Sequence, residues 1–211
     1  MILKKYMKNQ IKYFPKAYGL KTQADIDQLY NDWAETYDIE VKENGYVSPT
    51  RLALALRSFL PTDAIIYDIG CGTGLSGIAL KELGFSNIHG SEINPNMLKK
   101  AYLTGAYQSL RKGDINNPFP EEVGKYNAIV AVGVIGAGAA PAKLMIDALN
   151  ALLSGDIFAF SLNDAAMAQE SCQKTLKHIY DNKIATEVFS EYGPHLSSIG
   201  VGSTIYILKR I

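Results

Sequence analysis

The chain of 211 residues has few cysteines, no net charge and no long apolar run. Its two cysteines, Cys71 and Cys172, are too few for a disulfide framework or a zinc site. A run of about 18 apolar residues, which a transmembrane helix needs, does not occur. Basic and acidic residues both number 21, so no overall field draws the chain to nucleic acid or to an anionic membrane. We therefore expect a cytoplasmic protein with no metal, no membrane and no nucleic acid as partner.

Acidic residues are absent from residues 1–21, which carry six lysines interleaved with Tyr6, Tyr13, Phe14 and Tyr18. Charge runs of this kind are usually solvated, so we expect a basic arm. The alternative is a contact surface for an anionic substrate or partner. Because this segment has lysines but no apolar core region, we do not expect a secretory signal.

Residues 22–60 have apolar side chains at helical spacing, with a break near Asn44-Gly45 and an end at Pro61. This pattern predicts helices ahead of the first strand. We therefore expect residues 1–60 to form the basic arm and a helical cap. Residues 61–211 are expected to form the main domain, and both parts belong to one structural unit.

From residue 61 onward, short β-branched or apolar runs alternate with segments of helical spacing. The predicted strands are 64–68, 87–92, 109–112, 126–132, 157–162, 185–192 and 203–209. The helices are expected at 75–83, 94–102, 141–153 and 165–182. Such alternation indicates βαβ units and a sheet covered on both faces. The predicted fold is α/β, a Rossmann-like three-layer sandwich with a mostly parallel seven-stranded sheet, a C-terminal antiparallel hairpin and an N-terminal helical cap.

Residues 67–77, YDIGCGTGLSG, follow the first predicted strand and open a helix. From Gly72 the letters satisfy the dinucleotide pattern G-x-G-x-x-G, and Glu92 stands where that fold places an acid for ribose hydroxyls. Asp68 argues the other way, because a carboxylate beside the loop repels a diphosphate and attracts a cation. Asp114 can accept a hydrogen bond from an exocyclic adenine amine. NAD and a cationic nucleoside both remain open on these residues.

The stretch DIGCGTG, from Asp68 to Gly74, resembles motif I of the class I S-adenosylmethionine-dependent methyltransferases. The resemblance continues through residues 90–101 (GSEINPNMLKKA), 113–115 (GDI) and 126–130 (YNAIV). Residues 29–38 (LYNDWAETYD) are similar to the Trp-Ala-x-x-Tyr-Asp segment of small-molecule members. The subgroup related to the Williams–Beuren region protein 27 is the one that the chain resembles most.

This resemblance implies S-adenosyl-L-methionine as cofactor and S-adenosyl-L-homocysteine as its product. Asp68 and the backbones of Gly70 and Gly72 would meet the amino acid end of the cofactor, and Glu92 would accept both ribose hydroxyls. The other residues implied for cofactor binding are, in chain order, Trp33, Tyr37, Cys71, Thr73, Gly74, Ile93, Met97, Asp114, Ile115 and Gly133. Ordinary core packing is the alternative for Trp33, Tyr37 and Met97, since each is an apolar residue at helical spacing.

Methyl transfer from a sulfonium requires alignment above all, and a base only where the acceptor is protonated. His195, between the last two predicted strands, is the candidate base, and Tyr37 is a second catalytic candidate; Tyr46 and Tyr192 are weaker ones. Residues 133–141 contain no acid, histidine or aromatic residue. They also lack the Asn-Pro-Pro-Tyr of enzymes that methylate amino groups in nucleic acids, so we expect a small-molecule acceptor. A non-catalytic module that binds S-adenosylmethionine and an NAD-dependent oxidoreductase are the alternatives.

Overall fold

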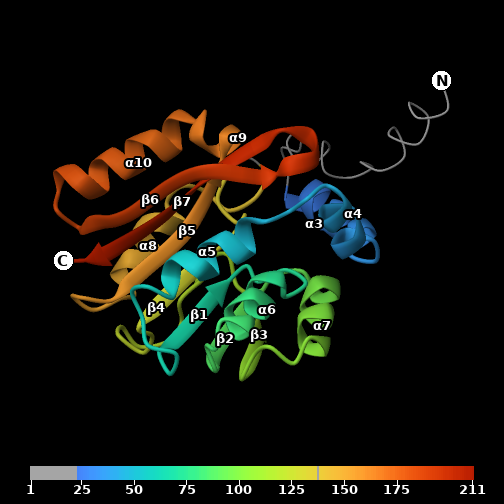
Figure 1. Cartoon of the computed structure of the whole chain (residues 1–211), viewed down its shortest axis with the longest axis horizontal. Coiled ribbons are helices and arrows are strands. Elements are labelled where there is room, and N and C mark those ends of the chain that lie inside the picture. Colours follow the sequence, from blue (N-terminus) through green and yellow to red (C-terminus); the bar gives the residue numbers. More distant parts are fainter. Residues whose placement is uncertain (1–22, 137) are drawn as a thin grey trace.

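A computed structural model describes residues 23–136 and 138–211. The predicted basic arm, residues 1–21, therefore lies outside the described residues. The sheet has seven strands in the order β3-β2-β1-β4-β5-β7-β6 (Figure 1). Strands β1 to β5 run parallel, whereas β7 is antiparallel to β5 and β6 is antiparallel to β7. The predicted fold class is confirmed. The strands are β1 (Ile65–Ile69), β2 (Asn87–Glu92), β3 (Ser109–Lys112), β4 (Ala128–Ala131), β5 (Ile157–Asn163), β6 (Ala185–Leu196) and β7 (Val201–Arg210).

Helices precede the sheet and connect its strands. They are α3 (Gln23–Trp33), α4 (Tyr37–Glu43), α5 (Ser48–Leu56), α6 (Leu75–Glu82), α7 (Pro95–Leu103), α8 (Leu144–Asn150), α9 (Asp164–Met167) and α10 (Glu170–Asp181), with a 3₁₀ turn η1 (Ser197–Ile199). Within the described ranges, no helix is both long and apolar enough to cross a membrane.

Two apolar clusters fill the space on the two faces of the sheet. Helices α5 and α6 contribute to one cluster, and α8 and α10 contribute to the other. Ile129 and Val130 are neighbours in β4, yet each is fully buried in a different cluster. Successive side chains of a strand point to opposite faces, so this strand is buried on both. The three-layer arrangement leaves the carboxyl edge of the parallel strands as the place where loops from several strands meet.

Several boundaries differ from the sequence-based expectation. The helical pattern that begins at residue 22 breaks between Trp33 and Tyr37, where Thr36 N bonds to Trp33 O at 3.0 Å. The expected helix 165–182 is likewise two helices, α9 and α10, and β6 continues past residue 192 to Leu196. The long β6 follows from its pairing with β7, which passes two register shifts. These contacts are made across the fold, so local spacing carries no sign of them.

Of the residues expected to form the cap, α5 packs on the sheet instead. Polar contacts attach the remaining described part, residues 23–47 and called the cap below, to the main domain. Thr73 Oγ1 in the glycine loop donates to Asp38 Oδ1 at 2.5 Å. Asn94 Nδ2, at the start of α7, donates to Asn31 Oδ1 at 2.9 Å. Asn94 also caps α7, as the sequence predicts, because its Oδ1 accepts from Asn96 N and Met97 N at 2.9 and 3.1 Å. The cap therefore lies against the loops at the carboxyl edge of the sheet.

Leucines on opposite sides of α5 give a matched test of how this helix is held to the sheet. Leu56 is 0% exposed within the cluster of α5 and α6, whereas Leu54 is 55% exposed. We predict that Leu56→Ala lowers the free energy of unfolding by about 2–5 kcal/mol, since it leaves a cavity in the core. Leu54→Ala should change it by less than about 0.5 kcal/mol. Urea titration followed by circular dichroism measures both, and equal losses would contradict the packing described.

Candidate cofactor-binding site

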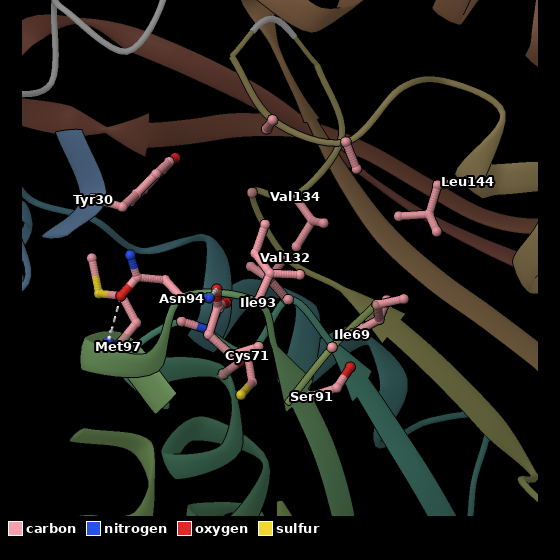
Figure 2. Close-up of a pocket in the computed structure, with 18 of the residues that line it drawn as sticks. Tyr30, Ile69, Cys71, Ser91, Ile93, Asn94, Met97, Val132, Val134 and Leu144 are labelled. Carbon is pink, nitrogen blue, oxygen red and sulfur yellow. Dashed lines mark hydrogen bonds between the residues drawn. The ribbon is translucent and has the colours of Figure 1, made fainter. Parts of the chain in front are cut away.

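A cavity of about 200 Å³ that opens to solvent lies at the carboxyl edge of the sheet. Its walls come from the segments after β1, β2, β3 and β4, and from the cap. Figure 2 shows Tyr30 of α3, Met97 of α7 and Val134 of the β4 loop approaching it from different elements. Ligands of open parallel sheets bind at this edge, where the strand order reverses between β1 and β4.

The glycine loop after β1 forms the floor of the cavity. Gly70 and Gly72 have φ of 65° and 56°, a region that side chains with a Cβ rarely adopt. A Cβ on Gly70 would lie 2.8 Å from Val134 Cγ2, so this glycine lets the β1 and β4 loops touch. A Cβ on Gly72 would meet nothing within 4 Å, because Gly72 faces open space. A ligand can therefore approach the Gly72 backbone directly.

Glu92 ends β2 and lines the cavity, although it is largely buried. Its Oε2 accepts a hydrogen bond from Gly72 N at 3.0 Å, and its Oε1 accepts one from Asn94 N at 2.8 Å. Burial raises the pKa of Glu92, while these backbone donors act in the opposite direction. The carboxylate is thus held between the glycine loop and the start of α7, with its orientation fixed for a ligand above the loop.

Asp68 lies beneath the glycine loop, 1% exposed, and does not line the cavity. Its Oδ2 accepts hydrogen bonds from Ser76 Oγ at 2.5 Å and from the Tyr107 hydroxyl at 2.7 Å. Among the described residues, its buried Oδ1 has no hydrogen-bond partner. Burial raises the pKa of Asp68 to about 7. The structure therefore does not place this carboxylate at the mouth of the loop, where the sequence interpretation located it, but under the loop that carries the site.

This arrangement disfavours a diphosphate on the loop. A dinucleotide fold offers free backbone N–H groups at the helix N-terminus to the phosphates. Here Gly72 N already donates to the Glu92 carboxylate, whose negative charge would lie beside the phosphates. The third glycine of the G-x-G-x-x-G pattern, Gly77, packs against the Tyr107 side chain, and its N donates to the Tyr107 hydroxyl at 3.0 Å. The loop is therefore suited to a neutral or cationic ligand.

Three tyrosines of the cap, Tyr30, Tyr37 and Tyr46, line the cavity. Trp33 does not; it is buried behind them, stacked on Tyr30 at 5.9 Å and edge-on to Tyr37 at 4.7 Å between ring centroids. The core-packing alternative therefore describes Trp33, and its contacts with Tyr30 and Tyr37 hold two cavity rings in place. Aromatic faces attract cations, so the cap tyrosines add to the preference for a cationic ligand that the carboxylate gives the cavity.

His195 is 4% exposed and does not line the cavity. Its Nδ1 is 2.8 Å from Ser48 Oγ, and its ring is edge-on to Tyr46 at 5.1 Å between centroids. Burial lowers the pKa of His195 to about 4. A general base must reach the proton it removes, and this side chain lies behind Tyr46. The structure thus does not bring the predicted base to the site.

Eleven of the residues predicted for the site line the cavity: Tyr37, Gly70, Cys71, Gly72, Thr73, Glu92, Ile93, Met97, Asp114, Ile115 and Gly133. Gly74 does not, and a Cβ there would lie 2.9 Å from Thr104 Cγ2, so this glycine packs the loop against α7. Sequence reasoning missed Tyr30, although it lies one helical turn before Trp33, and gave Tyr46 only a weak role as a base. Within the described residues, no group of three or more histidines, cysteines and acids is placed to hold a metal.

Comparisons with known proteins agree with this geometry. A family model described as "Methyltransferase domain" matches residues 62–193. Human Methyltransferase-like protein 27 is 33% identical over 129 residues, which cover 59% of this chain and 53% of that protein. The chain thus spans about half the length of this curated relative.

Solved structures show the same fold at low identity. A crystal structure of an S-adenosylmethionine-dependent methyltransferase from Thermotoga maritima has a TM-score of 0.62 and 16% identity, covering 88% of this chain and 97% of that one. Magnesium protoporphyrin IX methyltransferase from Synechocystis, with bound S-adenosylmethionine, has a TM-score of 0.59 and 18% identity, covering 94% and 90%. The family match, covering more than half of the chain, decides the family. The chain therefore belongs to the methyltransferase domain family, and it shares the fold of solved S-adenosylmethionine-dependent methyltransferases.

Proposed function

We propose that this enzyme methylates a small-molecule acceptor by in-line transfer in the space between the cap and the sheet. The main support for this proposal is the position of the cap, whose Tyr30, Tyr37 and Tyr46 line the cavity at the carboxyl edge of the strands. An acceptor must enter that space to meet a cofactor on the glycine loop. Such a confined site supports a small molecule more than a folded nucleic acid or protein.

The residues present fit S-adenosylmethionine. Gly72 leaves open space above its backbone, and the Glu92 carboxylate lines the same cavity. Glu92 would hold the ribose hydroxyls, while Asp114 and Ile115 would fix the adenine. Bound S-adenosylmethionine supplies an electrophilic methyl group on a sulfonium, which becomes a neutral thioether on transfer. Asp68 would act through the loop rather than by direct contact, since it orients the segment through Ser76 and Tyr107.

The charge of the cavity points to the class of acceptor. Its charged lining side chains within the described part of the chain are Glu92, Asp114 and Asp147, all acidic. Glu92 and Asp114 are assigned to the cofactor, and Asp147 is paired with Lys143 at 2.5 Å. Because no described lining side chain would neutralise an anionic acceptor, we propose a neutral or cationic one. No histidine or lysine from the described residues lines this space. The acceptor would therefore bring a nucleophile that already has a free lone pair at working pH, and the protein would supply alignment.

Replacing the carboxylate of Glu92 tests the proposed cofactor site. We predict that Glu92→Gln weakens binding of S-adenosylhomocysteine about 10- to 100-fold, because an amide is a poorer acceptor for the ribose hydroxyls than a carboxylate. Isothermal titration calorimetry measures the change. Glu82→Gln, on the exposed side of α6, is the matched control and should bind like wild type. Unchanged affinity in Glu92→Gln would contradict the assignment.

The buried position of Asp68 predicts how stability depends on pH. Between pH 3.8 and about 7 its carboxyl ionises in the unfolded chain but stays protonated in the folded one. The unfolded state then binds fewer protons, so stability falls as pH rises through this window. We predict that wild type loses about 1.4 kcal/mol per pH unit there relative to Asp68→Asn, which does not ionise. Urea unfolding from pH 4 to 8 measures the difference, and parallel stability curves for the two proteins would refute it.

The size class of the acceptor is testable without knowing its identity. The enzyme is incubated with methyl-labelled S-adenosylmethionine and a cell extract divided by ultrafiltration into small-molecule and macromolecular fractions. We expect label to move into the small-molecule fraction, and Glu92→Gln to reduce that transfer at limiting cofactor. Label found only in macromolecules would overturn the proposal. Cofactor binding without transfer in either fraction would instead indicate a non-catalytic binding module.

A further inference from the structure

Tyr46 lies at the narrow point between the cap and the sheet. A Cβ built on Gly133 would lie 2.9 Å from the Tyr46 hydroxyl oxygen, and both residues line the cavity. Gly133 has φ of 69°, and its N donates to Ser161 Oγ of β5 at 2.8 Å. Gly133 is thus held from the sheet side while the phenol covers it from the cap side. The hydroxyl is placed over the carboxyl end of β4.

The backbone around Tyr46 is held by the C-terminal hairpin. Tyr46 pairs with Leu196 in an isolated antiparallel bridge, and Val47 N donates to His195 O at 3.1 Å. Tyr46 N also donates to Val41 O at 3.0 Å, at the end of α4. These contacts come from two sides, so the ring enters the cavity from a segment with little freedom to move.

A buried polar chain supports the Tyr46 ring from behind. His195, edge-on to that ring, bonds through Nδ1 to Ser48 Oγ, which lies 2.9 Å from Ser203 Oγ. Arg51 Nη1 donates to Ser203 O at 3.1 Å and to Pro194 O at 2.9 Å. Because burial lowers the pKa of His195 to about 4, this imidazole is neutral near pH 7. His195 therefore supports the Tyr46 ring, which accounts for a histidine near the end of β6 without a role as base.

The strand order indicates where the nucleoside part and the remaining part of a bound cofactor would lie. Strands β3, β2, β1 and β4 are neighbours in that order. If Glu92 of β2 and Asp114 after β3 hold the nucleoside, the rest of the ligand must extend over β1 and β4. The glycine loop and Val134 meet there, with Gly133 and the Tyr46 hydroxyl above. This part of the argument rests on the proposed function.

We propose that the Tyr46 hydroxyl faces the methyl-bearing sulfonium of the bound cofactor and aligns it for transfer. A phenolic oxygen has lone pairs that attract C–H groups polarised by a neighbouring positive charge, and its ring face attracts a cation. The surroundings favour this role. Tyr37 and Glu92 line the same cavity as Tyr46. Burial raises the pKa of Tyr37, and its neighbours Tyr46, Tyr30, Asp38 and Glu92 raise it further. Phenols and a carboxylate therefore face one space, which suits a positive centre.

Three ligands that differ at one position test this assignment by calorimetry. They are S-adenosylmethionine, S-adenosylhomocysteine, which lacks the methyl group and the charge, and sinefungin, in which an amine-bearing carbon replaces the methyl-bearing sulfonium. Tyr46→Phe removes only the hydroxyl. We expect it to weaken binding of the methylated cofactor and of sinefungin about tenfold, as loss of a bond to a charged group does. Binding of S-adenosylhomocysteine should stay within about twofold of wild type, because that ligand offers no positive centre.

Tyr192→Phe is the matched control. The Tyr192 hydroxyl also packs over a glycine, Gly202, and contacts Asp164 Oδ1 at 3.2 Å, but it does not line the cavity. This variant should bind all three ligands as wild type does.

The outcomes separate the two proposals. Wild-type protein that binds none of the three ligands would contradict the proposed cofactor site itself. Wild-type binding with a Tyr46→Phe variant that loses all three equally, or none, would overturn the role of the hydroxyl and leave the cofactor site intact. A loss confined to the two cationic ligands supports it.

Discussion

The carboxylate of Glu92 joins the parts of the molecule that make the site. It receives the Gly72 and Asn94 backbone N–H groups, so it sets the distance between the glycine loop and the start of α7. Asn94 in turn caps α7 and bonds Asn31 in the cap. The glycine loop, the start of α7 and the cap, which all border the cavity, are therefore connected through the buried carboxylate of Glu92. Its burial costs free energy that these two donors offset, since a buried charge needs such partners.

On both sides of the cavity, buried residues hold the residues that line it in position. Beneath the glycine loop, the Asp68 carboxyl accepts hydrogen bonds from Ser76 and Tyr107 and so stabilises the loop that contains Gly72. At the cover, Trp33 packs behind Tyr30 and Tyr37. A ligand then meets side chains that are already in position, and little ordering is left to be done on binding. Preorganised alignment is what a displacement without acid catalysis requires of its enzyme.

The sequence-based predictions are correct for features that local residue types decide, and they are wrong for features that tertiary contacts decide. The Asn94 cap and all seven strands follow from residue types and spacing. The positions of Asp68, Trp33 and His195 do not, because a carboxylate at a loop or an aromatic at helical spacing looks the same whether it faces a ligand or the core. Tyr30 and Trp33 are three residues apart and share one helix face. Only the packing of α3 decides which of them lines the cavity.

The order of the last two strands has a consequence for how the chain assembles. β6 precedes β7 in the sequence but touches the sheet only through β7, which lies between β5 and β6. During synthesis, β6 emerges from the ribosome with no edge to join until β7 follows it. The segment that holds Tyr46 pairs with Leu196 at the end of β6. Pairing of the Tyr46 segment with β6 is therefore coupled to the final step of sheet formation, whereas the contacts of Asp38 and Asn31 with the glycine loop and α7 do not need β7.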